Sequence, residues 1–375
     1  MRKKIGELKI MILKRDTEVL CDKIKIYNFF ISEILDIPKL QEIGIVNIIK
    51  GRKIYILVNK KDEISSVCIK ENEYFDNLIY AVGIDGHVFS EIELSVPDDE
   101  KYHNLNCMRL EEYQLRLEEI KDFLLKEYGI VIRFEDSKFK TMEINKTIIL
   151  NDEFLKYQRP IKTIMYLFPK KLRLKEHDYF SEDQNTEKNF KRSIETFMKD
   201  SGKQGITIKF YDKKKQLESK YKIYLPFECL RFEITLKKPS KIRKDLGTNK
   251  VFELTDEKLN VYFRKFIDEN IRKPMELYQK QMKSNLRRIL KKCYSPSSHT
   301  WSRDILLQIS GQELEKGVPF MFDVINLLNE LDVLKLGSKQ KKYSVKQRFI
   351  SICREELRIY MNEDGKRCYE LLTKL

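Results

Sequence analysis

Two stretches in the middle of the chain alternate apolar and polar residues with period two. They run from Ile206 to Lys213 (ITIKFYDK) and from Cys229 to Lys238 (CLRFEITLKK). This period is typical of a strand that buries one face. Each stretch has a carboxylate in its polar series or at its end, Asp212 in the first and Glu233 in the second. We therefore predict two neighbouring strands that bring two acids together amid lysines and arginines.

Shorter strand patterns occur in the N-terminal part of the chain. Residues 43–58 contain two apolar runs on either side of Gly51-Arg52-Lys53, and residues 78–96 contain two more around a glycine-rich turn. Each range therefore predicts a hairpin. Residues 21–35, in contrast, are expected to form a helix.

A later strand is expected to contribute a third acid. Residues 130–135 and 141–150 predict two strands, and alternation in the second places Glu143, Asn145 and Thr147 on one face. On spacing alone, Glu143 fits an acid on a solvated surface as well as a ligand.

Apolar positions at three- and four-residue spacing predict helices in the rest of the chain. One begins after a Thr255 cap, continues past Phe266, and is limited or kinked by Pro274 before it resumes to Lys292. The polar residues 175–185 are expected to be a loop. The other helical ranges are 109–128, 152–167, 186–199, 214–224 (a short helix or a basic hairpin), 302–314, 320–331 and 344–361. The predicted fold class is α+β, with a mainly antiparallel sheet and helices packed on one face.

These elements predict three parts of the chain. Residues 1–106 form a β-rich region that leads into the core sheet, residues 107–294 form the core, and residues 300–375 form a mostly helical domain. Ser295-Pro296-Ser297-Ser298 is the expected linker. The basic segment from Gly337 to Lys342 suits a winged-helix or helix-turn-helix module that binds DNA, and a plain helical bundle is the alternative.

Net charge suggests the class of partner. The chain of 375 residues has a formal net charge of +15. Nucleic acid is the expected partner, because lysines and arginines that dock on a polyanion release its condensed counterions; a lysine-rich proteome is the alternative explanation. No apolar run approaches the roughly 20 residues of a membrane span, so we expect a cytoplasmic protein without a membrane partner. Seven cysteines without zinc-type spacing are typical of reduced thiols.

Several familiar catalytic motifs are missing, which leaves carboxylate, tyrosine and lysine chemistry. The sequence has no phosphate-binding loop, no dinucleotide fingerprint and no nucleophile elbow, and its four histidines form no spaced pair. Carboxylates on adjacent strands suit Mg²⁺ or Mn²⁺, and a tyrosine hydroxyl can attack a phosphate that the metal polarises. The candidate nucleophiles are Tyr262, which has Lys265 on the same helical face, and Tyr278. Helix packing is the alternative role of each tyrosine.

A set of short motifs spans roughly residues 90 to 270. They are Ser95-Val96-Pro97, Asn104-Leu105, Met142-Glu143-Ile144-Asn145, Phe210-Tyr211-Asp212-Lys213, Leu230-Arg231-Phe232-Glu233-Ile234, Leu246-Gly247 and Phe252-Glu253-Leu254. In this order and spacing, the set resembles the gene II type, replication-associated initiators of filamentous phages and related plasmids.

The resemblance implies a rolling-circle replication initiator with a relaxase-like antiparallel sheet. Such an enzyme nicks one origin strand through a tyrosine, with a divalent metal, and rejoins the strand after synthesis. By position, it implies metal ligands at Glu143, Asp212 and Glu233. Many rolling-circle enzymes bind their metal through a His-hydrophobic-His pair, which this chain lacks, so metal binding would rest on carboxylates or be lost. The phosphate contacts that we expect are Lys213, Arg231, Lys237, Lys241, Arg243 and Lys244.

Two further functions fit the sequence. The first is a non-catalytic, sequence-specific DNA-binding protein of a phage or plasmid, which keeps the sheet as a scaffold and reads DNA through residues 300–375. The second is an RNA-binding protein, since strands with alternating Tyr, Phe and Lys can stack single-stranded bases. For the initiator, the expected partners are DNA, as a single strand or an origin duplex, and a host helicase or polymerase.

Overall fold

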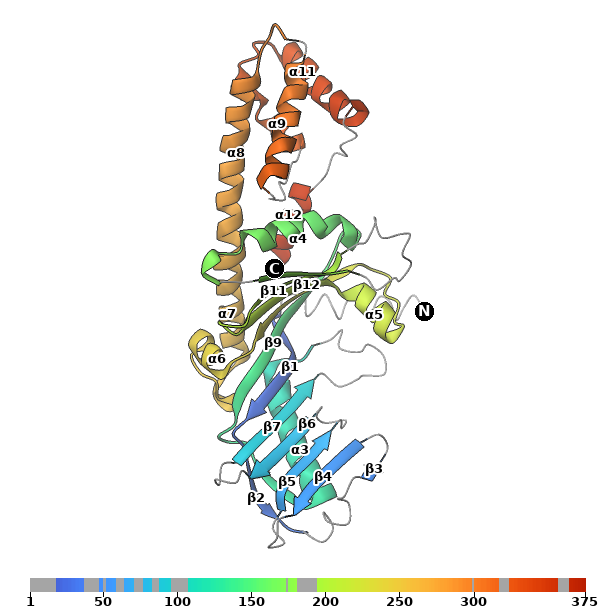
Figure 1. Cartoon of the computed structure of the whole chain (residues 1–375), viewed down its shortest axis with the longest axis vertical. Coiled ribbons are helices and arrows are strands. Elements are labelled where there is room, and N and C mark those ends of the chain that lie inside the picture. The colour runs from blue at the N-terminus through green and yellow to red at the C-terminus, as the bar shows by residue number, and fades with distance from the viewer. Residues whose placement is uncertain are drawn as a thin grey trace. The chain divides into compact units, whose positions relative to one another are not determined.

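A computed structural model gives the architecture of the chain (Figure 1). It describes residues 18–36, 47–49, 52–58, 64–70, 77–82, 88–95, 107–172, 175–180, 194–298, 300–316, 324–356 and 364–375. The motif residues 96–97 and 104–105 and the predicted elements at 43–46, 181–193, 320–323 and 357–361 lie outside these ranges. The chain divides into two compact units: unit 1 comprises residues 1–150, 173–179 and 198–264, and unit 2 comprises the remaining residues.

The described strands form one long sheet and one short one. The long sheet has the order β10-β11-β12-β13-β9-β1-β7-β6-β5-β4-β3, and β2 pairs with β8 in the second sheet. The pairs around the centre, β12-β13, β13-β9, β9-β1 and β1-β7, are antiparallel. The strands are β1 Leu20–Tyr27, β2 Phe30–Ile34, β3 Asn47–Ile49, β4 Arg52–Val58, β5 Ile64–Lys70, β6 Asn77–Val82, β7 Val88–Ser95, β8 Ile130–Arg133, β9 Lys138–Ile149, β10 Lys175–Phe180, β11 Ile194–Ser201, β12 Ile206–Asp212 and β13 Cys229–Leu236.

One face of the central strands is apolar and carries helices. Successive residues of a strand point to opposite faces, so Phe232 and Ile234 share the face that Glu233 does not occupy. Phe232 packs on Phe210 of β12 and on Phe263 of α7 (Asp256–Ile267), with ring centroids 4.6 and 5.7 Å apart. Helix α6 (Pro239–Leu246) also contacts β9 and β13 and buries Ile242. Unit 1 further contains α3 (Leu110–Tyr128) and α5 (Lys213–Tyr221).

The described residues of unit 2 are mainly helical, with the end of β10 and part of β11 as its strand residues. It contains α4 (Gln158–Leu167), α8 (Lys273–Cys293), α9 (Trp301–Lys316), α10 (Val324–Asn329), α11 (Lys339–Ser351) and α12 (Asp364–Lys374). Trp301 lies in a buried cluster with Leu286 of α8 and Phe349 of α11. A π-helical turn, Asp268–Arg272, separates α7 from α8, and Pro274 occupies the first turn of α8. In the described part of the chain, no helix is long and apolar enough to cross a membrane.

The structure confirms the α+β class and most of the elements predicted for the core. It confirms the strands predicted at 206–213, 229–238 and 141–150, the helix at 109–128, and a helix rather than a hairpin after Asp212.

Three predicted elements are wrong. Residues 21–35 form β1 and β2 instead of a helix, residues 175–180 form β10 instead of a loop, and residues 194–199 belong to β11 instead of a helix. These strands are held by pairing with strands that are distant in the sequence, such as β1 with β7 and β9. Local spacing cannot reveal such pairing.

Candidate functional site

The second face of the central strands is polar, and we call it the acid face. In β13 the alternating residues Arg231, Glu233 and Thr235 point to it, although all three are buried. The register with β12 places Lys209 opposite Glu233, and the register with β9 places Asn145 on the other side of Glu233. One residue pair further, Glu143 of β9 lies opposite Thr235. Two of the predicted acids therefore share one face on neighbouring strands.

A bulge in β1 adds a third acid to this face. Cys21 pairs with Ile144 and Ile24 with Met142, so Asp22 and Lys23 together lie opposite the single residue Glu143. Such a bulge re-aims side chains, and bulges are frequent beside active sites. Asp22 is buried, and its own backbone carbonyl accepts a 2.6 Å hydrogen bond from the Tyr113 hydroxyl of α3.

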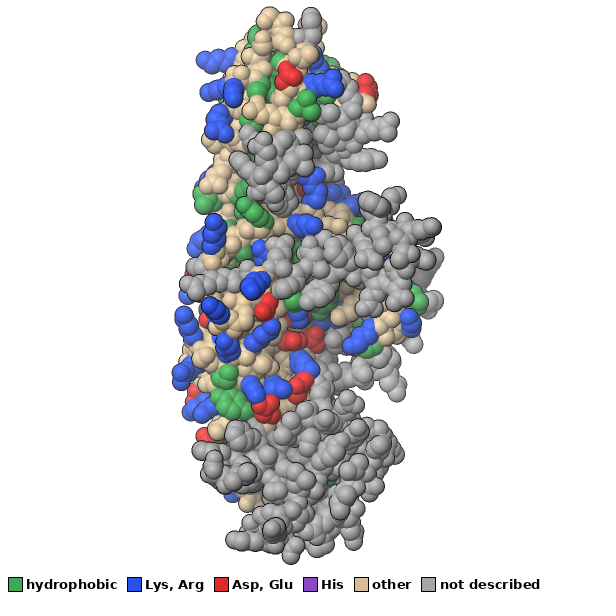
Figure 2. Space-filling view, in the orientation of Figure 1, with side chains coloured by type: hydrophobic (Ala, Val, Ile, Leu, Met, Phe, Trp, Pro, Cys, Tyr) green, Lys and Arg blue, Asp and Glu red, His purple; other side chains and the backbone are tan. Residues whose placement is uncertain are grey.

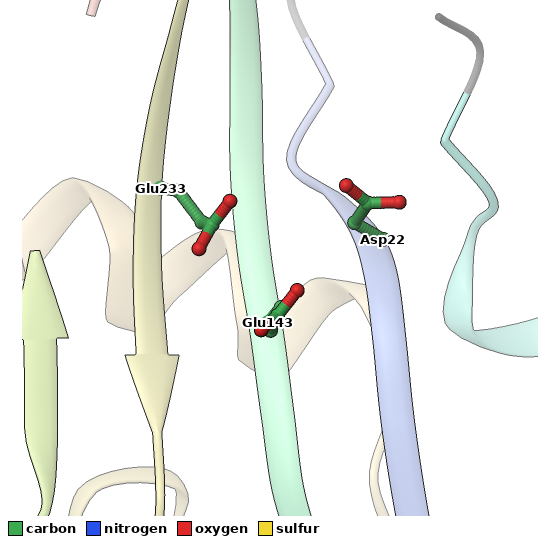
Figure 3. Close-up of side chains that lie close together, drawn as sticks. All are labelled: Asp22, Glu143 and Glu233. Carbon is green, nitrogen blue, oxygen red and sulfur yellow. The ribbon is translucent and has the colours of Figure 1, made fainter. Parts of the chain in front are cut away.

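Asp22, Glu143 and Glu233, which we call the acid group, point toward one another from three adjacent strands (Figure 3). Each offers an oxygen, and these oxygens all lie within 4.8 Å of one another. Burial, and next the charge of Glu233, raise the pKa of Glu143 to about 7. The three carboxylates therefore repel one another, and a bound cation would relieve the repulsion.

Two cations of the chain contact the acid group. The Lys209 ammonium donates to Glu233 Oε1 at 2.5 Å, and Thr235 Oγ1 donates to the same oxygen at 3.1 Å. Arg231, which is fully buried, donates from a terminal guanidinium nitrogen to Asp22 Oδ2 at 3.1 Å and from Nε to Thr147 Oγ1 at 3.0 Å. Burial lowers the pKa of Lys209, but the charges of Glu233 and Glu143 outweigh it and raise the pKa.

Asn145 is a buried amide beside the acid group. The residue is 1% exposed, and it is the direct cross-strand neighbour of Glu233. Neither its amide oxygen nor its amide nitrogen makes a hydrogen bond of normal geometry to a described residue, although the Cys107 thiol lies close enough to interact with it. A buried polar group in this state is costly, which suggests that a ligand satisfies it.

The donors at this site fit a hard divalent cation. Carboxylate and amide oxygens are the ligands that Mg²⁺, Mn²⁺ and Ca²⁺ prefer, whereas zinc sites usually contain histidine or cysteine. The Asn145 amide oxygen is a further potential ligand on this face, and the raised pKa of Glu143 shows that added positive charge would be favourable there.

Asp212, the third predicted ligand, lies outside the acid group. Its carboxylate is the N-cap of α5 and accepts a hydrogen bond from the Lys215 backbone N–H at 2.9 Å. An aspartate just before a helical stretch is a strong cap signal, so the sequence contained the information for this role. Asp22 was missed because the bulge in β1 breaks the alternation that identified the other acids.

The two tyrosine candidates are placed differently. Tyr262 belongs to α7, the helix that packs on the apolar face through Phe263, so it lies across the sheet from the acid group. Its hydroxyl is buried, and burial followed by Asp245 of α6 raises its pKa well above the usual value. Tyr278 is on α8 and Lys265 is an exposed residue near the end of α7; both belong to unit 2.

The predicted phosphate contacts separate into buried and exposed residues. Lys213 and Arg231 are fully buried. Burial, and next the charge of Arg231, lower the pKa of Lys213 to about 7. The Lys213 ammonium donates a hydrogen bond to Gln216 Oε1 at 2.8 Å. Arg243 and Lys244 of α6 are exposed. Two others form ion pairs, Lys237 with Asp200 at 2.7 Å and Lys241 with Asp245 at 2.9 Å. Lys237, Arg243 and Lys244 are therefore open to a phosphate, the Lys241 side chain is only 17% exposed, and Lys213 and Arg231 are closed to it.

Comparisons with known proteins assign no family. No protein-family model matches the chain, and no curated protein matches its sequence. A solved structure similar to it is the rolling circle replication initiator protein from Geobacillus stearothermophilus, with a TM-score of 0.31 and 13% identity over 60% of this chain and 76% of that chain. This likeness is too low to assign the protein to a family.

Proposed function

We propose that the protein is a rolling-circle DNA replication initiator of a phage or plasmid, built on a relaxase-like sheet. It nicks one origin strand through a phosphotyrosine intermediate and rejoins it. The observation that carries the proposal is the acid group, in which three carboxylates from adjacent strands converge within 4.8 Å. The net charge of +15 and the order of the sequence motifs support DNA as the substrate.

The residues of the acid face would have separate roles. Asp22, Glu143 and Glu233 would hold the metal, and Arg231 and Thr235 would fix the orientation of Asp22 and Glu233 through their hydrogen bonds. A bound Mg²⁺ or Mn²⁺ supplies charge that polarises the scissile phosphate. The exposed Arg243 and Lys244, with Lys237 and Lys241, are the remaining candidates for phosphate contacts along the strand.

The covalent step exchanges one phosphate ester for another. The tyrosine oxygen attacks phosphorus as its proton leaves to a base, the bond from phosphorus to the 3′ oxygen breaks, and that oxygen takes up a proton. The reverse reaction, with a 3′ hydroxyl as the nucleophile, rejoins the strand. Tyr262 lies on the opposite side of the sheet from the acid group, and the hydroxyls of both Tyr262 and Tyr278 are buried, so both tyrosines are tested as nucleophiles.

Formation of a covalent adduct tests the proposal. The full chain is incubated with Mn²⁺ and labelled single-stranded oligonucleotides that tile the DNA flanking its gene, and the adducted tyrosine is mapped by mass spectrometry. We expect a covalent adduct that is lost in Asp22→Asn and Glu233→Gln. Tyr262→Phe and Tyr278→Phe identify the nucleophile, because the variant without the attacking hydroxyl should form no adduct. Oligonucleotide binding without any adduct would refute the nicking activity.

A second function is favoured by the ion pairs of the site. Lys209 and Arg231 already neutralise part of the acid group, as they would in a sheet that is only a scaffold. The protein would then be a non-catalytic, sequence-specific DNA-binding protein that reads DNA through its C-terminal helices. It would bind a specific duplex, form no adduct, and show no stabilisation by Mn²⁺.

A further inference from the structure

Lys209 occupies the position beside the acid group where a bound cation would be expected. Its ammonium lies 2.5 Å from Glu233 Oε1, and the charge of Glu143 also acts on it. Glu233 is 4% exposed in its side chain, whereas the Lys209 side chain is 28% exposed. The carboxylate is therefore fixed in the interior, and the lysine reaches it from a position partly open to solvent.

We propose that a divalent cation enters the acid group by displacing the Lys209 ammonium from Glu233, and that the Asn145 amide oxygen becomes a ligand of the ion. This inference rests on the metal site of the proposed function and adds how the site is filled. A lysine and a divalent ion both need the oxygen of Glu233, and their like charges repel at short range. Binding of one therefore opposes binding of the other.

The charges of the site favour such an exchange. Three carboxylates converge at the site, and Lys209 and the buried Arg231 form ion pairs with Glu233 and Asp22. Arg231 cannot leave, because it is fully buried and donates hydrogen bonds to both Asp22 and Thr147. Lys209 has a flexible four-carbon stem and can turn outward. It is thus the cation that can make room.

Asn145 supplies independent evidence that a ligand belongs here. Its amide is buried next to Glu233, and neither polar atom makes a hydrogen bond of normal geometry within the described part of the chain. An amide oxygen is a good ligand for a hard cation and adds no further negative charge. The inference therefore gives a role to the buried Asn145 amide and to the partly exposed Lys209.

Displacement would also give Lys209 a second partner. Once it leaves Glu233, its partly exposed side chain can turn toward solvent and contact a phosphate of a bound strand. A lysine forms a point-charge contact with phosphate without strict geometry. The metal and the substrate strand would then support each other's binding.

The test is Mn²⁺ binding to the full chain without DNA. The electron paramagnetic resonance signal of free Mn²⁺ measures the affinity, and thermal unfolding measures the stabilisation. Lys209→Met keeps the stem and removes the competing charge, so it should bind Mn²⁺ about tenfold more tightly than the wild type. It should also melt lower without metal and show a larger Mn²⁺-induced rise in Tm. Asn145→Leu should weaken Mn²⁺ binding about tenfold without lowering the metal-free Tm.

Lys214→Met is the matched control. Lys214 forms a half-buried pair with Glu228 at 2.6 Å in the same unit but away from the acid group, so Mn²⁺ affinity should stay within about twofold of the wild type. If Lys209→Met does not fold, Lys209→Gln is titrated instead, with the same expected tightening.

Each outcome supports or overturns the exchange. Unchanged or weaker Mn²⁺ binding in the Lys209 variant would overturn it, as would wild-type affinity in Asn145→Leu. Absence of Mn²⁺ binding in the wild type would overturn both the exchange and the metal site. Tighter binding in Lys209→Met without any DNA adduct would support the exchange and refute only the nicking activity.

Discussion

Glu143 links the chemistry of the acid group to the stability of the fold. Burial and the charge of Glu233 raise its pKa from the ordinary 4.5 to about 7. The folded protein therefore holds this proton more tightly than the unfolded chain does. The stability that protonated Glu143 contributes is therefore complete below about pH 4.5. It is lost as the pH rises through 7, because Glu143 then ionises beside the other acids.

Glu143→Gln should remove this pH dependence, because glutamine resembles the protonated acid and cannot ionise. In metal-free buffer we expect the variant to match the wild type near pH 5 and to exceed it near pH 8 by on the order of 2 kcal/mol. Urea unfolding at the two pH values measures the difference. Glu118→Gln, which changes an exposed acid of α3 that pairs with Lys121, is the control and should differ equally from the wild type at both values. A pH-independent effect of Glu143→Gln would contradict the charge repulsion.

At the scale of elements, the sequence predicts what depends on local alternation and misses what depends on distant pairing. The strands β12 and β13 alternate strictly, so their extent and the shared face of Glu143 and Glu233 were predictable. In β1 the bulge at Asp22 and Lys23 interrupts the alternation, and the segment was predicted as a helix. Asp22, the third acid of the group, was therefore not predicted.

The same division explains the two errors among the site residues. Asp212 ends an alternating stretch, but the helix that follows uses it as a cap, and this role was readable from the sequence. Tyr262 lies four residues from Phe266 on an amphipathic helix, so its helix was predictable. Which face of the sheet that helix covers depends on the contact between Phe263 and Phe232, which no local pattern encodes.

The hairpin between β11 and β12 depends on Gly205. Its φ is +66°, and a Cβ at this position would lie 2.7 Å from Lys238 Cγ. Its N–H donates to Ser201 O and its carbonyl accepts from Lys237 N, so the turn holds the start of β12, the strand that carries Lys209. Gly205→Ala should therefore lower the free energy of unfolding by about 1–2 kcal/mol.

Gly202→Ala is the matched control in the same turn, because a Cβ added there would have no atom within 4 Å and the φ of Gly202 is not in the left-handed region. Chemical denaturation of both variants gives the comparison. Equal stability of the two variants would show that the left-handed conformation of Gly205 does not constrain the hairpin.

At the scale of the whole molecule, positive charge is widespread while the acid group is confined to one face of one sheet. On the face shown in Figure 2, many Lys and Arg side chains lie on the described surface. The net charge of +15 attracts a polyanion, and the buried carboxylates would repel the same polyanion unless a cation neutralises them. Binding of nucleic acid and binding of metal are therefore expected to assist each other.

Salt dependence measures how many of these charges meet phosphates. Affinity for a single-stranded oligonucleotide should fall with salt with a logarithmic slope of about 0.7 per phosphate neutralised, against about 0.9 on a duplex. Replacing the exposed Arg243 or Lys244 by Ala should reduce the slope by about 0.7, the contribution of one phosphate contact on a single strand. Lys126→Ala on α3 should leave the slope unchanged. Fluorescence anisotropy at several salt concentrations gives the slopes. Affinity that is nearly independent of salt would contradict nucleic acid as the partner, because a chain with a net charge of +15 binds a polyanion by releasing its counterions.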